Sequence, residues 1–204
     1  MKVFAVERLW DEWQLTREEL DNYELAPPTS FPVTMCADSA LVRRGMPMFV
    51  PDFATDKWKI HLQPYVVTSR LGKSIPCRFA ERYYDSIGLA ARLLPPQIER
   101  PDRHLNALTA SFDGAIAPGP TMPIATLAGE DGALNISVGN ELMLTINIAD
   151  LHINETVSFL SRYMIMKTGD IILLCDTAIT LPAKIGSTID ANINGQPLLN
   201  VRLK

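Results

Sequence analysis

Residues 70–85, Arg-Leu-Gly-Lys-Ser-Ile-Pro-Cys-Arg-Phe-Ala-Glu-Arg-Tyr-Tyr-Asp, decide how the middle of this chain is interpreted. From Phe79 to Leu94, apolar residues recur at helical spacing. By periodicity alone, this pattern predicts one long amphipathic helix that Pro95 and Pro96 end. A short helix followed by a buried strand gives a similar pattern, so periodicity does not separate the two interpretations.

Outward from this stretch, most segments have the pattern of β-strands. Val3–Val6 is a short apolar run, and residues 171–175 form a second one. Alternating apolar residues and turn residues predict three β-hairpins, over residues 40–50, 134–148 and 189–203. Asn194-Gly195 is typical of a type I′ turn. Asn154, which precedes an acidic residue, predicts the start of a helix.

Composition favours a cytoplasmic protein of one domain. The 204 residues include 19 basic and 23 acidic ones, a formal net charge of −4, and no basic run suggests nucleic acid as a partner. Three cysteines lie far apart and form no CxxC pattern, which is typical of buried thiols in a reducing compartment. No signal-peptide core and no membrane-length apolar run is present, so we expect no membrane partner.

Residues 70–85 and Lys167-Thr-Gly-Asp-Ile-Ile-Leu173 together resemble the fumarylacetoacetate hydrolase family. The resemblance covers nearly the whole chain. It extends to family members that are isomerases of 2-hydroxyhepta-2,4-diene-1,7-dioate. It implies a mixed, mainly β fold with short helices, a β roll of twisted sheets, and a homodimer. Residues 1–204 would form one such domain, with residues 1–36 as an N-terminal extension that carries a short strand. It also implies a short helix ending near Asp85 and then a strand through Arg92.

Family members hydrolyse or isomerise small diketo acids with a divalent metal held by carboxylates, and here those carboxylates are missing. The family's Glu-x-Glu pair falls on His61 and Gln63, and its metal-binding aspartate falls on Gly88. A spacing of two places both members of the pair on one face of a strand. Because Mg²⁺ prefers anionic oxygen ligands, imidazole and amide groups are poor substitutes. We therefore expect no metal at His61, Gln63 and Gly88.

The family's other polar site positions are also changed. A family lysine corresponds to Ala110, and the histidine that acts as general base corresponds to Trp13, whose ring cannot accept a proton. Only Arg92 survives, and the resemblance gives it a role in binding substrate or supporting the metal aspartate. An arginine paired locally or exposed to solvent is the simpler interpretation, because a site needs several convergent groups.

Three functions remain open. The simultaneous loss of the metal ligands and of other polar site residues favours a catalytically inactive homologue that is retained as a binding or partner protein. The alternative is a hydrolase or isomerase of small diketo or hydroxy-dienoic acids that uses Mg²⁺ or Mn²⁺ in a rearranged site. A third is a sensor in which Arg92 binds a small carboxylate. Zinc at His61 and Gln63 would need two more ligands, and His104 and His152 are the only other histidines.

Overall fold

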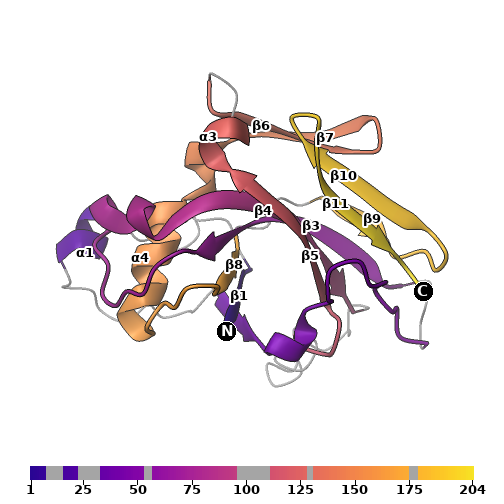
Figure 1. Ribbon diagram of the computed structural model, residues 1–204, viewed down its shortest axis with the longest axis horizontal. Coiled ribbons are helices and arrows are strands. Elements are labelled where there is room, and N and C mark those ends of the chain that lie inside the picture. The colour runs from indigo at the N-terminus through magenta and orange to yellow at the C-terminus, as the bar shows by residue number, and fades with distance from the viewer. Residues whose placement is uncertain (8–15, 23–32, 53–56, 96–110, 128–130, 175–178) are drawn as a thin grey trace.

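The structure is a computed structural model, and it describes residues 1–204 except 8–15, 23–32, 53–56, 96–110, 128–130 and 175–178. Two β-sheets dominate the described part, and one long helix lies beside the larger sheet (Figure 1). None of the helices in this part has the length and apolar character needed to cross a bilayer.

The larger sheet has seven strands in the order β2-β1-β8-β3-β4-β5, and β9 also pairs with β3. Their bounds are β1 (Val3–Val6), β2 (Val33–Cys36), β3 (Lys59–Thr68), β4 (Tyr84–Leu94), β5 (Ile116–Pro123), β8 (Ile171–Leu173) and β9 (Thr180–Pro182). In the central antiparallel pair, three residues of β3 lie opposite three of β4: His61 opposite Arg92, Gln63 opposite Ala90, and Tyr65 opposite Gly88. Since side chains of paired residues share one face of a sheet, these six positions lie on the same face.

The smaller sheet has the order β11-β10-β6-β7 and consists of antiparallel pairs. Its strands are β6 (Ala133–Val138), β7 (Glu141–Asn147), β10 (Thr188–Ile193) and β11 (Gln196–Arg202). The two hairpins predicted over residues 134–148 and 189–203 are confirmed. Asn194 and Gly195 have φ values of 50° and 77°, the positive values that a type I′ turn requires.

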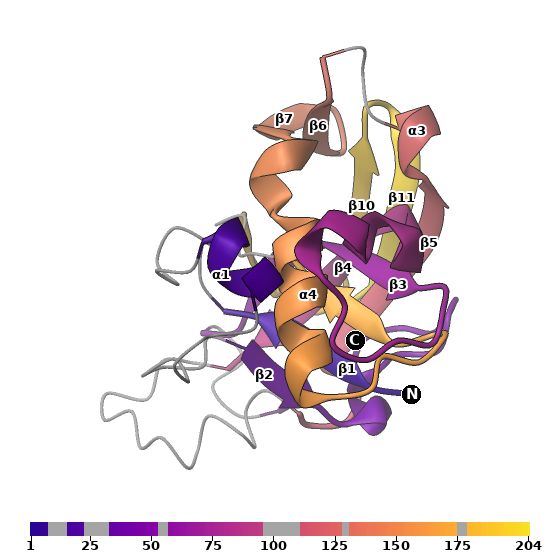
Figure 2. The same cartoon turned by 90° about the vertical axis from the view of Figure 1, so that its left-hand side faces the viewer.

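Within the described ranges, the helices are short apart from α4 (Ile153–Tyr163), which packs against η3 (Cys77–Tyr83) and against α1 (Arg17–Asn22). Figure 2 shows α1 beside α4. The remaining ones are η2 (Asp38–Ala40), α3 (Ile124–Leu127) and η4 (Ile148–Leu151). The mainly β fold with short helices that the sequence predicts is therefore confirmed.

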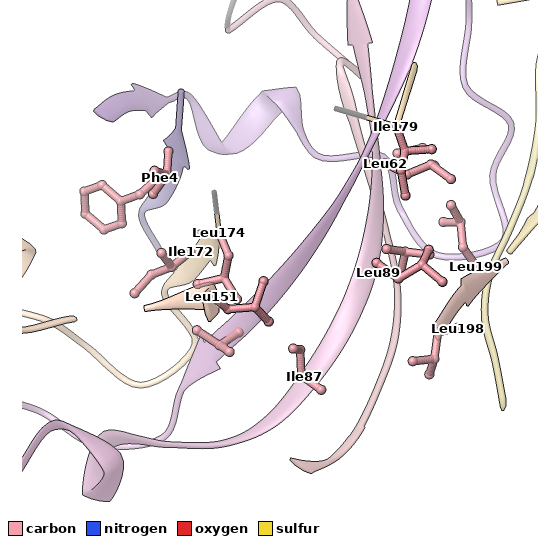
Figure 3. Packing of buried hydrophobic residues seen from close by; sticks show 14 of the residues in the cluster. Phe4, Leu62, Ile87, Leu89, Leu151, Ile172, Leu174, Ile179, Leu198 and Leu199 are labelled. Carbon is pink, nitrogen blue, oxygen red and sulfur yellow. The ribbon is translucent and has the colours of Figure 1, made fainter. Parts of the chain in front are cut away.

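The main core lies between one face of the larger sheet, α4 and the smaller sheet. Figure 3 shows Leu62 and Leu89 of the larger sheet beside Leu199 of the smaller one. A second, smaller apolar cluster covers the opposite face of the larger sheet and includes Tyr65 and Ala90. We call that opposite face, which carries His61, Gln63, Tyr65, Gly88, Ala90 and Arg92, the site face.

The interpretation that periodicity alone gives for residues 79–94 is wrong, and the one from the family resemblance is confirmed. The helical turns of η3 end at Tyr83, and β4 then runs from Tyr84 to Leu94. Every residue of β4 from Ile87 to Leu93 is buried. A strand buried on both faces has a nearly continuous apolar sequence, and such a run can match helical spacing by chance.

Two local predictions are corrected. Residues 40–50 form no hairpin, because Leu41 pairs with Ile116 and Met48 with Leu203, each through a parallel bridge. The α4 helix starts at Ile153, one residue before Asn154, and its cap is His152 in a left-handed conformation with φ of 45°.

Candidate functional site

The positions that the resemblance assigns to metal ligands lie on the site face, where β3 carries His61 and Gln63 and β4 carries Gly88 and Arg92. Pairing of β8 with both β1 and β3 continues this face toward the N-terminal strand. Trp13, Ala110 and His104 lie outside the described residues. His152 caps α4, which packs against the opposite face of the sheet. The two described histidines, His61 and His152, therefore do not form a cluster.

Gln63 is 1% exposed, and its amide group connects β3 with the end of β1 and the end of β8. The Nε2 group donates to the carbonyl oxygens of Val6 at 3.3 Å and Leu174 at 3.2 Å. The Oε1 atom has no hydrogen-bond partner in the described part of the chain. A carboxylate only accepts hydrogen bonds, so a glutamate here would turn two favourable contacts into repulsive ones. The residue at this position is therefore suited to holding strands together.

Tyr65 fills the space that a side chain at residue 88 would need. A Cβ atom on Gly88 would lie 2.5 Å from Tyr65 Cε1 and 2.8 Å from the carbonyl oxygen of Pro120. The Tyr65 ring is held in place because its hydroxyl donates to the carbonyl of Gly119. Burial raises the pKa of Tyr65 to about 12, so the hydroxyl keeps its proton at neutral pH. An aspartate at residue 88 does not fit beside this ring.

Arg92 is 5% exposed and forms a bidentate ion pair with Glu7. Its Nη1 and Nη2 atoms donate to the two carboxylate oxygens at 2.9 and 2.8 Å. The carboxylate that Arg92 binds therefore belongs to the chain itself. The sequence pattern did not predict Glu7 as the partner of Arg92. Glu7 does follow Val3 and Ala5 at a spacing of two, which places all three on the same side of an extended chain.

Divalent metal of the family's kind does not fit the described residues of the site face. Two of the expected positions carry the imidazole of His61 and the amide of Gln63, and neither group is anionic. Across the described ranges, no group of three histidine, cysteine, aspartate or glutamate residues could hold a metal ion.

The two motifs that carry the family resemblance have structural roles here. The carboxylate of Asp170, fully buried, accepts from the backbone N–H groups of Lys2 at 2.7 Å and Lys167 at 2.8 Å, and it pairs with the Lys2 ammonium. Gly72 exchanges two backbone hydrogen bonds with Met166, at 3.0 and 2.8 Å. These residues of the two motifs therefore fix connections between segments.

Several solved structures have a similar fold. A protein from Yersinia pestis CO92 described as a fumarylacetoacetate hydrolase family protein matches with a TM-score of 0.72 and 18% identity, over 100% of this chain and 93% of that one. A fumarylpyruvate hydrolase from Pseudomonas aeruginosa matches at 0.71 and 18%, over 100% and 89%. A 5-carboxymethyl-2-hydroxymuconate delta-isomerase from Mycobacterium smegmatis matches at 0.71 and 17%, over 99% and 78%.

No protein-family model and no curated protein sequence matches the chain. At identities below one in five residues, the structural likenesses show the fold. The resemblance to the fumarylacetoacetate hydrolase family, and the β roll of twisted sheets that it implies, are confirmed at that level.

Proposed function

We propose that this chain, which has the fold of fumarylacetoacetate hydrolase family proteins, has lost metal binding and catalysis and serves as a binding or partner protein. One observation carries the proposal. The three positions that the family resemblance assigns to metal ligands lie on the site face and hold His61, Gln63 and Gly88, and Tyr65 fills the space beside Gly88.

Chemical arguments support the absence of turnover. A metal in such a reaction would polarise the substrate's carbonyl group, and the described residues offer no carboxylate ligands at the expected positions. Tyr65 stays protonated, and burial raises the pKa of the Cys36 thiol, so neither is an ionised base or nucleophile at neutral pH. Arg92, the one surviving polar position, already binds the carboxylate of Glu7.

The alternative is a hydrolase or isomerase of small diketo or hydroxy-dienoic acids that uses Mg²⁺ or Mn²⁺. Among the structural matches, the hydrolase from Pseudomonas aeruginosa was crystallised with Mn²⁺ and pyruvate. For this chain, the alternative requires ligands from outside the described site face.

Metal analysis of the purified protein tests the proposal. We expect far less than one Mg²⁺, Mn²⁺ or Zn²⁺ per chain, and no turnover of an acylpyruvate when Mg²⁺ or Mn²⁺ is added. Light scattering should give the mass of a homodimer of the 22.6 kDa chain. Stoichiometric metal together with turnover that His61→Ala abolishes would instead establish the alternative.

A further inference from the structure

A hollow of about 520 Å³ lies at the N-terminal end of α4, away from the site face. Its polar lining comes from α1, η3, β4 and α4, and consists of Arg17, Glu81, Tyr84, Asp85, Asn154 and Glu155. The apolar part of its wall includes Ile124, Ile148 and Ile153. We call this space the α4 hollow. Its volume falls in the range typical of small-molecule sites, about 300–1,000 Å³.

Glu155 is the buried charge of the α4 hollow. The residue is 2% exposed, and its Oε1 atom forms an ion pair with the guanidinium of Arg17 and lies 3.6 Å from Nδ1 of His152. The Oε2 atom has no hydrogen-bond partner in the described ranges, although a buried carboxylate oxygen without a donor is costly. Because this atom is itself buried, the Glu155 carboxylate lacks one donor beside the hollow.

Electrostatics in the α4 hollow favour a cation. Glu81, Asp85 and Glu155 contribute three negative charges against one positive charge from Arg17. The Arg17 side chain is 68% exposed and can move into water, whereas Glu155, with a side chain 3% exposed, then needs another cation in its place. Tyr84 donates to the side chain of Asn154 at 2.7 Å, and burial raises the pKa of Tyr84, so this donor stays protonated.

Helix stabilisation explains only part of this arrangement. A glutamate in the first turn of a helix interacts favourably with the positive end of the helix dipole, which accounts for Glu155 as a residue type. This interaction does not explain why the Glu155 Oε2 atom has no hydrogen-bond partner in the described ranges. It also does not explain Glu81 and Asp85, which lie on other elements.

We propose that the α4 hollow binds a small aliphatic amine. An ammonium group has three N–H donors and can supply the one that Glu155 Oε2 lacks. It takes the place of the Arg17 guanidinium, while Glu81 and Asp85 add attraction and the alkyl chain lies against Ile124, Ile148 and Ile153. This site is separate from the site face, so it stands whether or not the proposed loss of catalysis is correct.

Titration calorimetry with putrescine at low salt tests the site, since exposed charges are screened as ionic strength rises. Butane-1,4-diol, which has the same chain length and no charge, serves as the neutral comparison. We expect putrescine to bind at one site per chain and the diol not to bind. The double variant Glu81→Gln/Asp85→Asn should weaken putrescine binding about tenfold, because each partly exposed charge is worth up to about a factor of five.

Arg17→Ala distinguishes this site from general attraction to an acidic protein. Since Arg17 competes for Glu155, its removal should tighten putrescine binding several-fold. Glu141→Gln, which removes an exposed carboxylate on β7, is the matched control and should leave binding unchanged. Circular dichroism confirms that each variant is folded. Absence of putrescine binding, equal binding of the diol, or equal losses in the double variant and the control would each overturn the proposal.

Discussion

Gly88 and Tyr65 determine how much room the site face offers. A Cβ atom on Gly88 would lie 2.5 and 2.7 Å from two atoms of the Tyr65 ring, closer than real contacts allow. The ring cannot easily turn away, because its hydroxyl is bonded to Gly119 and the residue is 3% exposed. The glycine and the tyrosine are therefore a matched pair, and each limits what the other position can hold.

A double-mutant cycle tests this pairing. Gly88→Ala should lower the free energy of unfolding by about 1–3 kcal/mol through overpacking. Tyr65→Ala should lower it by about 3–5 kcal/mol through loss of a buried ring. Tyr65→Ala removes the contact with the ring, although the contact with the Pro120 carbonyl oxygen remains. The double variant should therefore be about 1 kcal/mol more stable than the sum of the single effects implies. Urea unfolding provides the three values.

Gly186→Ala is the control for that cycle, since a Cβ at this position meets no atom within 4 Å. Its effect should add to that of Tyr65→Ala, because residues without shared contacts rarely couple. If Gly88→Ala and Tyr65→Ala are equally additive, the ring does not limit the space beside Gly88.

At the scale of elements, Asp170 joins the start of β1 to the turn that leads into β8. Three groups converge on its buried carboxylate: the Lys2 N–H, the Lys2 ammonium and the Lys167 N–H. Burial by itself raises the pKa of Asp170, but these hydrogen bonds outweigh it, so the pKa lies below the ordinary value of 3.8. The Lys167–Asp170 motif thus stabilises a parallel pairing between strands that are far apart in sequence.

Asp170→Asn should weaken this connection at neutral pH by about 3 kcal/mol, as expected when one partner of a buried ion pair is removed. The amide nitrogen of asparagine would also face an N–H donor. A carboxylate with a depressed pKa in the folded state stabilises above its unfolded pKa, and that stability is lost as pH falls through the folded pKa. The wild type should therefore lose more stability than Asp170→Asn when the pH falls from about 5 to below 4.

Urea unfolding of both proteins at several pH values measures this difference. Glu141→Gln, on an exposed position of β7, is the comparison that should keep the wild-type slope. Parallel curves for the wild type and Asp170→Asn would show that Asp170 does not contribute to acid unfolding.

Elements that pair with their sequence neighbours could be predicted, and elements that pair at long range could not. The β6–β7 and β10–β11 hairpins follow from alternation and turn residues, which are local signals. Residues 40–50 carry similar signals, yet Leu41 and Met48 pair with Ile116 and Leu203. A local sequence pattern cannot predict these long-range partners, since they depend on the order of the strands in the whole sheet.

At the scale of the whole molecule, the sequence predicted strands at the site positions but not what surrounds them. The family resemblance placed His61 and Gln63 on one strand and Gly88 on another, and the structure shows that these two strands, β3 and β4, pair with each other. The partners of these strands come from elsewhere: Glu7 is 85 residues from Arg92, and Leu174 is 111 residues from Gln63. Such contacts emerge only when β1, β8 and β3 are brought together.

Restoring the family's carboxylates should therefore not restore a metal site by itself. The triple variant His61→Glu/Gln63→Glu/Gly88→Asp adds three negative charges to a partly buried face, removes the two amide hydrogen bonds of Gln63, and places a side chain against the Tyr65 ring. We expect it to be several kcal/mol less stable than the wild type, since buried like charges and lost hydrogen bonds both destabilise.

Excess Mn²⁺ should leave the melting temperature of this triple variant nearly unchanged, because the Tyr65 ring occupies the space that the side chain of residue 88 needs. Adding Tyr65→Val opens that space, and a metal that binds only the folded state then raises the melting temperature in proportion to the logarithm of its concentration. Thermal unfolding of the triple and quadruple variants, each with and without Mn²⁺, makes the comparison, with near-UV circular dichroism to confirm folding. If Mn²⁺ stabilises both variants equally, the loss of metal binding rests on the three substitutions alone and Tyr65 has no part in it.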